Sequence, residues 1–206
     1  MSKDCVRGTS TIMLTSRRPR FRLAAGGVGV DCADVLLTDL GAVARDIGVR
    51  LDGILGGDFF RGRVVVIDYS AHRLELYPAR AFRYAGGGDT VSITVKRNRP
   101  WLVARLTVPG GTPVERELLI DTGSQDAVDD SVLLRSTERL SRGEASGLGA
   151  GFSVQLGRFS EVTIGRSTFR DVPGVVPAVP IVGSGILQRF RRLVFDYDAG
   201  RLYLER

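Results

Sequence analysis

One stretch of the chain occurs twice, and this repeat limits the folds that the sequence can adopt. Residues 67–77, IDYSAHRLELY, match residues 195–205, FDYDAGRLYLE, at a constant spacing (196 − 68 = 128). The matching pairs are Asp68/Asp196, Tyr69/Tyr197, Ala71/Ala199, Arg73/Arg201, Leu74/Leu202 and Leu76/Leu204. Each copy is typical of two short strands around a polar turn, because apolar residues alternate along both arms. The chain is therefore expected to contain two related β units.

A second motif precedes each copy of the repeat. In both places two apolar residues come before a glycine: Ile54, Leu55 and Gly56, then Ile181, Val182 and Gly183. A glycine after a buried strand end suits a backbone that turns sharply or lies close to another segment. The motif is therefore interpreted as structural.

The second half of the chain carries a complete series of β signals. WLVARLTV (101–108) and VERELLI (114–120) predict a hairpin, because both alternate and PGGTP lies between them. The later signals are FSVQL (152–156), EVTIG (161–165), the apolar run 174–182 and the final pair of strands. Residues 93–206 are therefore predicted to form one complete, mostly-β lobe.

The first half contains only the later part of this series. Residues 1–83 are predicted to be a partial lobe, the C-terminal half of one, with an inserted helix at 38–48. Thr38 is the expected N-cap of this helix and Gly48 its C-cap. Residues 84–92, YAGGGDTVS, are expected to be a linker to the complete lobe.

The stretch LLIDTGSQDAV, residues 118–128, is the strongest candidate for chemistry. Asp121 ends an apolar run, where a carboxylate is costly unless it is hydrogen-bonded or functional. Taken alone, Asp-Thr-Gly-Ser is also what an ordinary turn uses. Downstream, however, the glycine-rich segment SGLGAGF (146–152) precedes an alternating strand, and the apolar-apolar-glycine motif at 181–183 follows.

In this order the motifs resemble those of the retropepsin and pepsin families of aspartic proteases, and more narrowly bacterial members with two fused lobes. The resemblance covers residues 90–206, and residues 1–83 only from the part of a lobe that follows the flap. It implies a retropepsin-like acid-protease β-barrel lobe and an aspartic-type endopeptidase that hydrolyses a peptide or protein substrate. It also implies no metal and no organic cofactor.

The resemblance further implies roles for individual residues. Asp121 would be the catalytic aspartate and Thr122 would hydrogen-bond across to a facing loop. Gly123 would allow the tight loop backbone, and Ser124 would hydrogen-bond near the carboxylate. The flap tip over the substrate would consist of Gly147, Leu148, Gly149, Ala150 and Gly151, since a lid needs a flexible backbone.

Such a site needs a second carboxylate, and its expected position lies outside the sequence. Asp121 precedes Gly183 by 62 residues (183 − 121 = 62), and counting 62 back from Gly56 gives a position before residue 1. The partner is therefore expected from a missing N-terminal segment or, second, from another chain in a homodimer. A third hypothesis is a catalytically inactive peptide-binding or interaction module of the same fold.

Other functional classes have weaker support. A Ser-His-Asp site would need His72, the only histidine, which lies in the repeated turn where the second copy has Gly200. Asp126, Asp129 and Asp130 are interpreted as acidic residues at a helix start rather than as a metal site. The basic clusters lack a nucleic-acid-binding motif, and no apolar run reaches membrane-spanning length. Neither nucleic acid nor membrane is expected as a partner.

The N-terminus as written has no signal peptide. A periplasmic or secreted location stays open if the chain has further residues at that end. The cleavage preference, the natural substrate and the oligomeric state also stay open.

Overall fold

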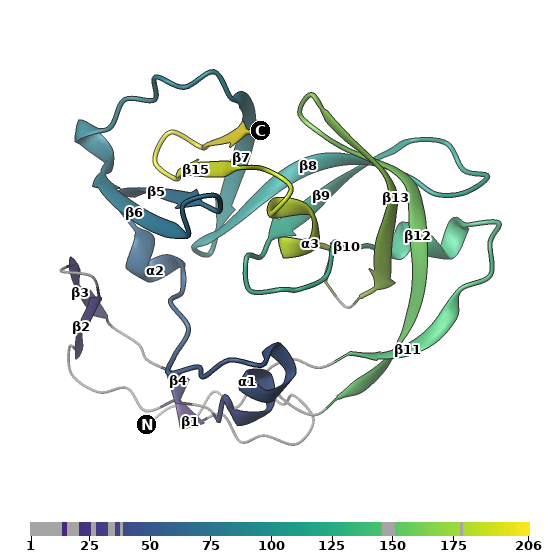
Figure 1. Ribbon diagram of the computed structural model, residues 1–206, viewed down its shortest axis with the longest axis horizontal. Helices are drawn as coiled ribbons and strands as arrows, with labels where there is room; N and C mark the ends of the chain where they lie inside the picture. The colour runs from purple at the N-terminus through teal and green to yellow at the C-terminus, as the bar shows by residue number, and fades with distance from the viewer. Residues whose placement is uncertain are drawn as a thin grey trace. The chain divides into compact units, whose positions relative to one another are not determined.

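The chain forms two compact units in the computed structural model, which describes residues 14–15, 21–25, 28–32, 36–37, 39–145, 151–177 and 179–206. Unit 1 comprises Met1–Phe59 and Glu144–Ser153, and unit 2 comprises Phe60–Gly143 and Val154–Arg206. Figure 1 traces the path of the chain through both units.

The described residues of unit 1 include two short strand pairs and helix α1, and helix α2 begins at the end of this unit. Strand β1 (Leu14–Thr15) pairs with β4 (Leu36–Leu37), and β2 (Phe21–Ala25) pairs with β3 (Val28–Cys32). Helix α1 (Gly41–Ile47) confirms the helix predicted here. The carboxylate of Asp39 accepts the N–H of Gly41 at 2.8 Å, and Gly48 ends the helix with φ 71°. The expected N-cap, Thr38, lies outside the described residues.

The remaining elements follow in chain order. They are α2 (Gly57–Phe60), β5 (Arg63–Asp68), β6 (Arg73–Pro78), η1 (Ala79–Ala81), β7 (Asp89–Lys96), β8 (Arg99–Thr107), β9 (Val114–Ile120), β10 (Val128–Asp129), η2 (Ser131–Arg135), β11 (Ser141–Ala145), β12 (Phe152–Ile164), β13 (Ser167–Val176), β14 (Ile181–Val182), α3 (Ser184–Leu187), β15 (Arg192–Asp196) and β16 (Arg201–Glu205).

The strands from β5 onward form one sheet that closes on itself. Its order is β11-β12-β13-β10-β14-β9-β8-β7-β16-β15-β5-β6. Strand β8 also pairs with β12, with Leu106 opposite Val162, so that β8, β9, β14, β10, β13 and β12 make a ring. A closed ring has no free edge between its members. The predicted fold class, a mostly-β protein with a barrel-like lobe, is confirmed.

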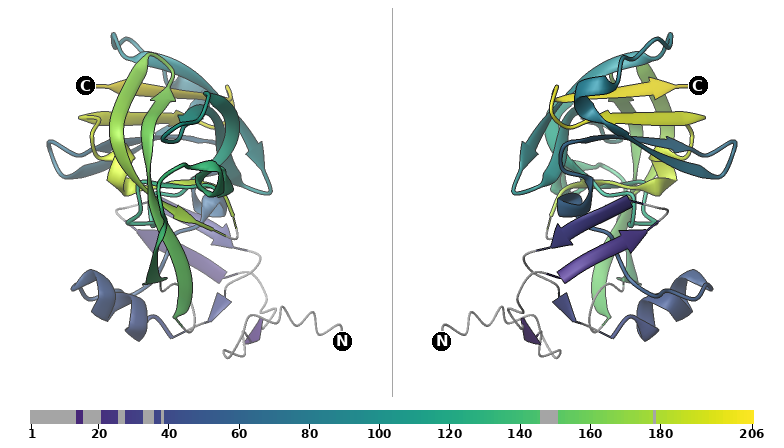
Figure 2. Two further views of the ribbon diagram at one scale, coloured as in Figure 1. Left: turned by 90° about the vertical axis from the view of Figure 1, so that its right-hand side faces the viewer. Right: turned by 90° about the vertical axis from the view of Figure 1, so that its left-hand side faces the viewer.

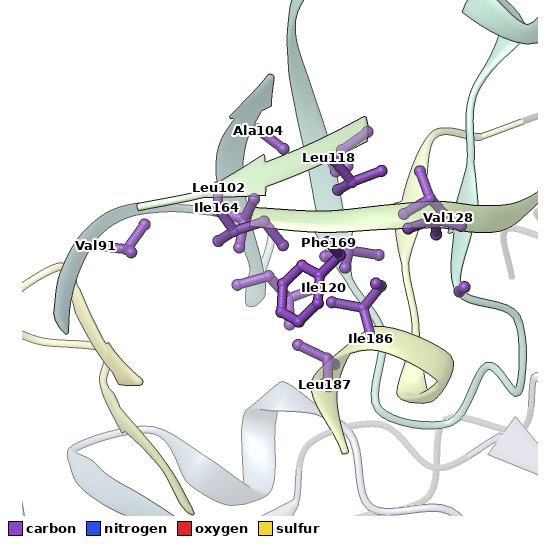
Figure 3. Packing of buried hydrophobic residues seen from close by; sticks show 14 of the residues in the cluster. Val91, Leu102, Ala104, Leu118, Ile120, Val128, Ile164, Phe169, Ile186 and Leu187 are labelled. Carbon is purple, nitrogen blue, oxygen red and sulfur yellow. The ribbon is translucent and has the colours of Figure 1, made fainter. Parts of the chain in front are cut away.

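The core consists of apolar side chains from every strand of the ring. One fully buried residue from each strand illustrates this: Leu106, Leu118, Val128, Val162, Val172 and Val182. Figure 3 shows Ile120 and Phe169 beside Ile186 and Leu187 of α3, which belong to the same cluster. Burying one such side chain stabilises the fold by about 1.5–3 kcal/mol, so this cluster is the main source of stability in unit 2.

Two features of the sheet differ from the sequence-based expectation. The strands predicted at 152–156 and 161–165 form one continuous strand, β12, because Gly157 pairs with Gly174 of β13 without a break. Residues 89–92, expected to end the linker, instead begin β7, which pairs with β16 and β8.

The two copies of the repeat form hairpins that pair with each other. Strands β5 and β6 make the first hairpin, β15 and β16 the second, and β5 lies antiparallel to β15. In Figure 2 the two yellow strands of the C-terminal hairpin lie side by side. His72 and Gly200 occupy the same place in the two turns, both with positive φ (51° and 63°). His72 is exposed, as expected for a turn residue.

Candidate active site

Asp121 lies at the exit of β9, where the strand is held at its end by β14. Leu119 pairs with Ile181 and Ile120 with Val182 in parallel register. The N–H of Asp121 then donates to the carbonyl oxygen of Val182 at 3.0 Å. These bonds position the backbone of Asp121, while the residue itself is half-buried and keeps access to solvent.

The loop after β9 folds back on the carboxylate of Asp121. The N–H of Gly123 donates to Oδ1 of Asp121 at 2.9 Å, and the N–H of Ser124 donates to its carbonyl oxygen at 3.3 Å. The hydroxyl of Ser124 accepts the N–H of Asp126 at 3.2 Å. Thr122 is exposed, and no hydrogen bond of its side chain is found within the described part of the chain. The group that binds the carboxylate is therefore the backbone of Gly123.

A second segment, residues 183–185, holds the loop through backbone hydrogen bonds. The N–H groups of Gly183 and Gly185 donate to the carbonyl oxygens of Ala127 and Asp126, each at 3.1 Å. A Cβ atom at Gly183 would lie 2.4 Å from the carbonyl oxygen of Asp126, a distance that real Cβ atoms do not reach. The glycine of the repeated motif is thus required by close approach to the Asp121 loop.

Ser184 also binds the loop, through both its backbone and its side chain. Its N–H and its hydroxyl both donate to the carbonyl oxygen of Ser124, at 2.8 and 2.6 Å. The loop of Asp121 is therefore tied to the start of α3 at several points, which holds the catalytic candidate in one geometry.

Within the described part of the chain, the first copy of the glycine motif has no such loop against it. A Cβ atom at Gly56 would meet no described residue within 4 Å. Ile54 and Leu55 are exposed, whereas Val182 at the corresponding place is fully buried. The glycine motif therefore packs against the Asp121 loop in the second copy, whereas in the first copy no described residue packs against its glycine.

Two neighbouring aspartates after the loop have opposite environments. The carboxylate of Asp130 accepts Nε of Arg116 at 2.9 Å and the N–H of Val132 at 2.8 Å, so it caps η2. Asp129 is also buried, yet its Oδ1 has no hydrogen-bond partner among the described residues. The interpretation of these residues as helix-start acids holds for Asp130 and is wrong for Asp129, which lies in strand β10.

Asp129 is the functional candidate that the sequence did not reveal. Burial raises the pKa of its carboxyl to about 7, and the negative charges of Asp126 and Asp121 add to the effect. Partial desolvation also raises the pKa of the Asp126 carboxyl, although much of that residue is open to solvent. The region around Asp121 is therefore rich in carboxyl groups that retain protons more readily than usual.

A pocket of about 460 Å³ lies beside the loop in unit 2. Its wall joins Asp126 and Ala127 to β12 and β13 through Leu156, Gly157 and Gly174. The other lining residues are Ser136, Glu138, Arg139, Leu140, Ser141, Arg158, Pro173 and Val175. A cavity of this size and mixed polarity can hold one or two peptide side chains next to the loop.

Strands β11 and β12 are neighbours in the sheet and flank the segment expected to form the flap. Of the expected tip, Gly147, Leu148, Gly149 and Ala150 lie outside the described residues. Gly151 is described and is exposed, just before β12.

The described part of the chain contains no group of three or more His, Cys, Asp or Glu side chains arranged to hold a metal ion. Within the same residues, no helix has the length and apolar character needed to cross a membrane.

No protein-family model matches the chain, and no curated protein sequence does either. Similar folds occur among solved structures. One is the crystal structure of a retropepsin-like aspartic protease from Rickettsia conorii, with a TM-score of 0.42 and 15% sequence identity. The similarity covers 60% of this chain and 95% of that one, and it is a likeness of fold.

Proposed function

We propose that this chain is part of an aspartic endopeptidase in which Asp121 supplies one of two catalytic carboxylates. The observation that carries the proposal is the loop geometry. Asp121 is half-buried and directly follows the buried end of β9. A network of backbone hydrogen bonds fixes its position. Such rigid placement of a carboxyl group is what general acid–base catalysis requires.

The proposed chemistry needs a second carboxylate close to Asp121. Like charges about 3 Å apart cannot both ionise, so the pair shares one proton. The ionised member removes a proton from a water molecule as its oxygen attacks the scissile carbonyl carbon. The protonated member donates to the carbonyl oxygen, and the resulting diol breaks its C–N bond when the amine takes up a proton. Neither step needs a metal ion.

The sheet supports a source of the second carboxylate in the same polypeptide. Val66 pairs with Val194, which is also its equivalent in the repeat (66 + 128 = 194). An antiparallel pair of equivalent residues implies a local two-fold axis between them, with β6 and β16 on the outer sides. In a symmetric dimer of complete lobes, the β15 of a second chain would lie where β5 lies here. Since β5 already occupies that edge, we propose that the second carboxylate comes from the lobe to which β5 and β6 belong rather than from a second chain.

The proposed substrate is an extended peptide whose side chain enters the pocket beside Asp126. The residues flanking the expected flap support this, because Ser141 of β11 and Leu156 of β12 both line the pocket. A lid formed by Gly147–Gly151 would then cover the peptide and exclude water from the reaction.

The second candidate function is a peptide-binding module without catalysis. One observation favours it: residues 1–55 contain no Asp-Thr-Gly, and a Cβ atom at Gly56 would meet no described residue within 4 Å. A single carboxylate would bind a peptide but would not complete the shared-proton pair.

Cleavage of a peptide library at acid pH, compared between the natural protein and its Asp121→Asn variant, tests the proposal. We expect a loss of at least about 10³-fold in kcat/KM in the variant. Its thermal stability should change little, because an asparagine Oδ1 can still accept the N–H of Gly123. A chelator should have no effect.

Two further outcomes separate the alternatives. Specific activity that stays constant on dilution supports a second carboxylate in the same chain, whereas activity that falls on dilution indicates a dimer. Peptide binding without cleavage in the natural protein, unchanged in Asp121→Asn, would contradict the protease and favour the binding module.

A further inference from the structure

Asp129 is a buried residue of β10, the strand that follows the Asp121 loop. Strand β10 lies between β13 and β14, so that Asp129 is opposite Val175 on one side and Ile181 on the other. Only 6% of its surface is exposed, and its Oδ1 has no hydrogen-bond partner among the described residues. An unpaired carboxylate in such a place is costly, whereas a neutral carboxyl is much less so.

The charged groups around Asp129 also disfavour its ionised form. Its cross-strand partners, Val175 and Ile181, carry no charge. The charges that raise its pKa are those of the Asp126 and Asp121 carboxylates. Arg116, on β9, is already engaged by Asp130 through its Nε. Burial and like charge therefore act in the same direction, and the pKa of Asp129 rises to about 7.

The coupling between Asp129 and the loop works in both directions. The repulsion between the carboxylates of Asp129 and Asp121 is mutual, so an ionised Asp129 also acts on the loop of Asp121. The same charge would act on Asp126, whose backbone carbonyl accepts from Gly185 and whose side chain lines the pocket. The protonation state of one buried group thus affects both the candidate catalytic carboxylate and the wall of the candidate substrate pocket.

We propose that Asp129 is a positioning residue that bears a proton while the site works and stops catalysis when it loses that proton. The proposal rests on the proposed function of Asp121. In its neutral form Asp129 adds no negative charge beside the Asp121 loop. Once ionised, it adds a buried negative charge behind the loop, which disturbs the charge balance of the shared-proton pair and loosens the strands around β10.

The pH dependence of peptide cleavage by the natural protein and by Asp129→Asn tests this inference. Asparagine has nearly the shape of the neutral carboxyl but cannot ionise. With each profile normalised to its own maximum, we expect the alkaline limb of the variant to move up by about one pH unit or more. Asp130→Asn is the matched control, because the residue is adjacent and buried but ion-paired. It should lower stability at neutral pH, where the natural protein has its ion pair, and leave the alkaline limb of the profile unchanged.

A second measurement does not depend on catalysis. The folded pKa of Asp129, about 7, lies above the unfolded value of 3.8, so its contribution to stability is complete below about pH 4 and is lost as the pH rises to 7. The melting temperature of the natural protein should therefore fall relative to that of Asp129→Asn over this range and then run parallel to it.

The two measurements separate failure of the inference from failure of the proposed function. If no cleavage is found but the two melting curves diverge as described, Asp129 holds its proton and the protease proposal fails. If the alkaline limbs coincide while the melting curves diverge, the role of Asp129 in catalysis is overturned. If the melting curves also run parallel from pH 4 to 8, the buried proton itself is refuted.

Discussion

Among single residues, Arg116 neutralises the fully buried carboxylate of Asp130. Its Nε reaches both oxygens of Asp130, at 3.1 and 2.9 Å, and the Asp130 side chain has no exposed surface. Arg116→Met would leave that charge buried with one backbone donor. We expect a loss of about 2–3 kcal/mol in the free energy of unfolding, measured by urea denaturation.

The exposed pair of Lys96 and Glu117 provides the control for this change. Both side chains are at least 40% exposed, so Lys96→Met should cost less than about 1 kcal/mol. If Arg116→Met costs no more than Lys96→Met, the buried ion pair does not stabilise the fold as we infer.

The aspartates also show how far sequence reasoning reaches at the residue scale. The cap formed by Asp130 follows from local chemistry, because an acidic residue before a helical turn accepts a nearby N–H. The burial of Asp129 does not, since it depends on β13 and β14 on either side, whose paired residues lie more than 40 positions away. Asp121 could be found because its signal, an apolar run followed by Asp-Thr-Gly-Ser, is contained in one short stretch.

At the scale of elements, Gly183, which directly follows β14, allows the Asp121 loop to pack closely against the backbone. The backbone of Gly183 is extended (φ −109°, ψ −171°), so alanine is sterically unfavourable there through contact rather than through backbone strain. The added Cβ would meet the carbonyl oxygen of Asp126 at 2.4 Å. We expect Gly183→Ala to lower the free energy of unfolding by about 1–3 kcal/mol and to reduce peptide cleavage more than stability alone explains.

Gly56→Ala is the matched control, since it changes the equivalent glycine of the first copy. The new methyl group would meet none of the residues that the structure describes within 4 Å. Its effect on the free energy of unfolding should stay within about 0.5 kcal/mol. Equal effects of the two substitutions in a denaturation experiment would remove the explanation of Gly183 by close approach.

Which strands could be predicted depends on where their partners lie. The hairpin of β8 and β9 and the two repeat hairpins were predictable, because alternating residues and a turn lie within about 20 positions. Strands β10 and β14 have two residues each and are defined by pairing with distant segments. Their sequences carry no alternation to detect. Strand β12 was predicted in two pieces because Gly157 interrupts the pattern that the pairing with β13 continues.

For the molecule as a whole, the pairing of β5 with β15 makes the two repeats parts of one sheet. Val66 and Val194 are both fully buried and belong to one apolar cluster. Because each lies in the equivalent place beside the local two-fold axis, Val66→Ala and Val194→Ala should have similar costs, about 2 kcal/mol each. The double variant should differ from the sum, since the two residues are paired.

Chemical denaturation measures all three variants, with Val103→Ala as the control. Val103 is 53% exposed, so its truncation should change the free energy of unfolding by less than about 0.5 kcal/mol. A negligible cost for Val66→Ala beside a full cost for Val194→Ala would mean that β5 is not docked on β15.

The same pairing has a consequence for synthesis on the ribosome. The first hairpin is made 128 residues before the second (194 − 66 = 128), and translation adds about 5–20 residues per second. The Val64–Val66 edge of β5 therefore waits on the order of ten seconds for the strand that will cover it. An unpaired, valine-rich edge is a template for pairing with other chains. A nascent chain of this protein must keep that edge shielded until β15, residues 192–196, has been translated.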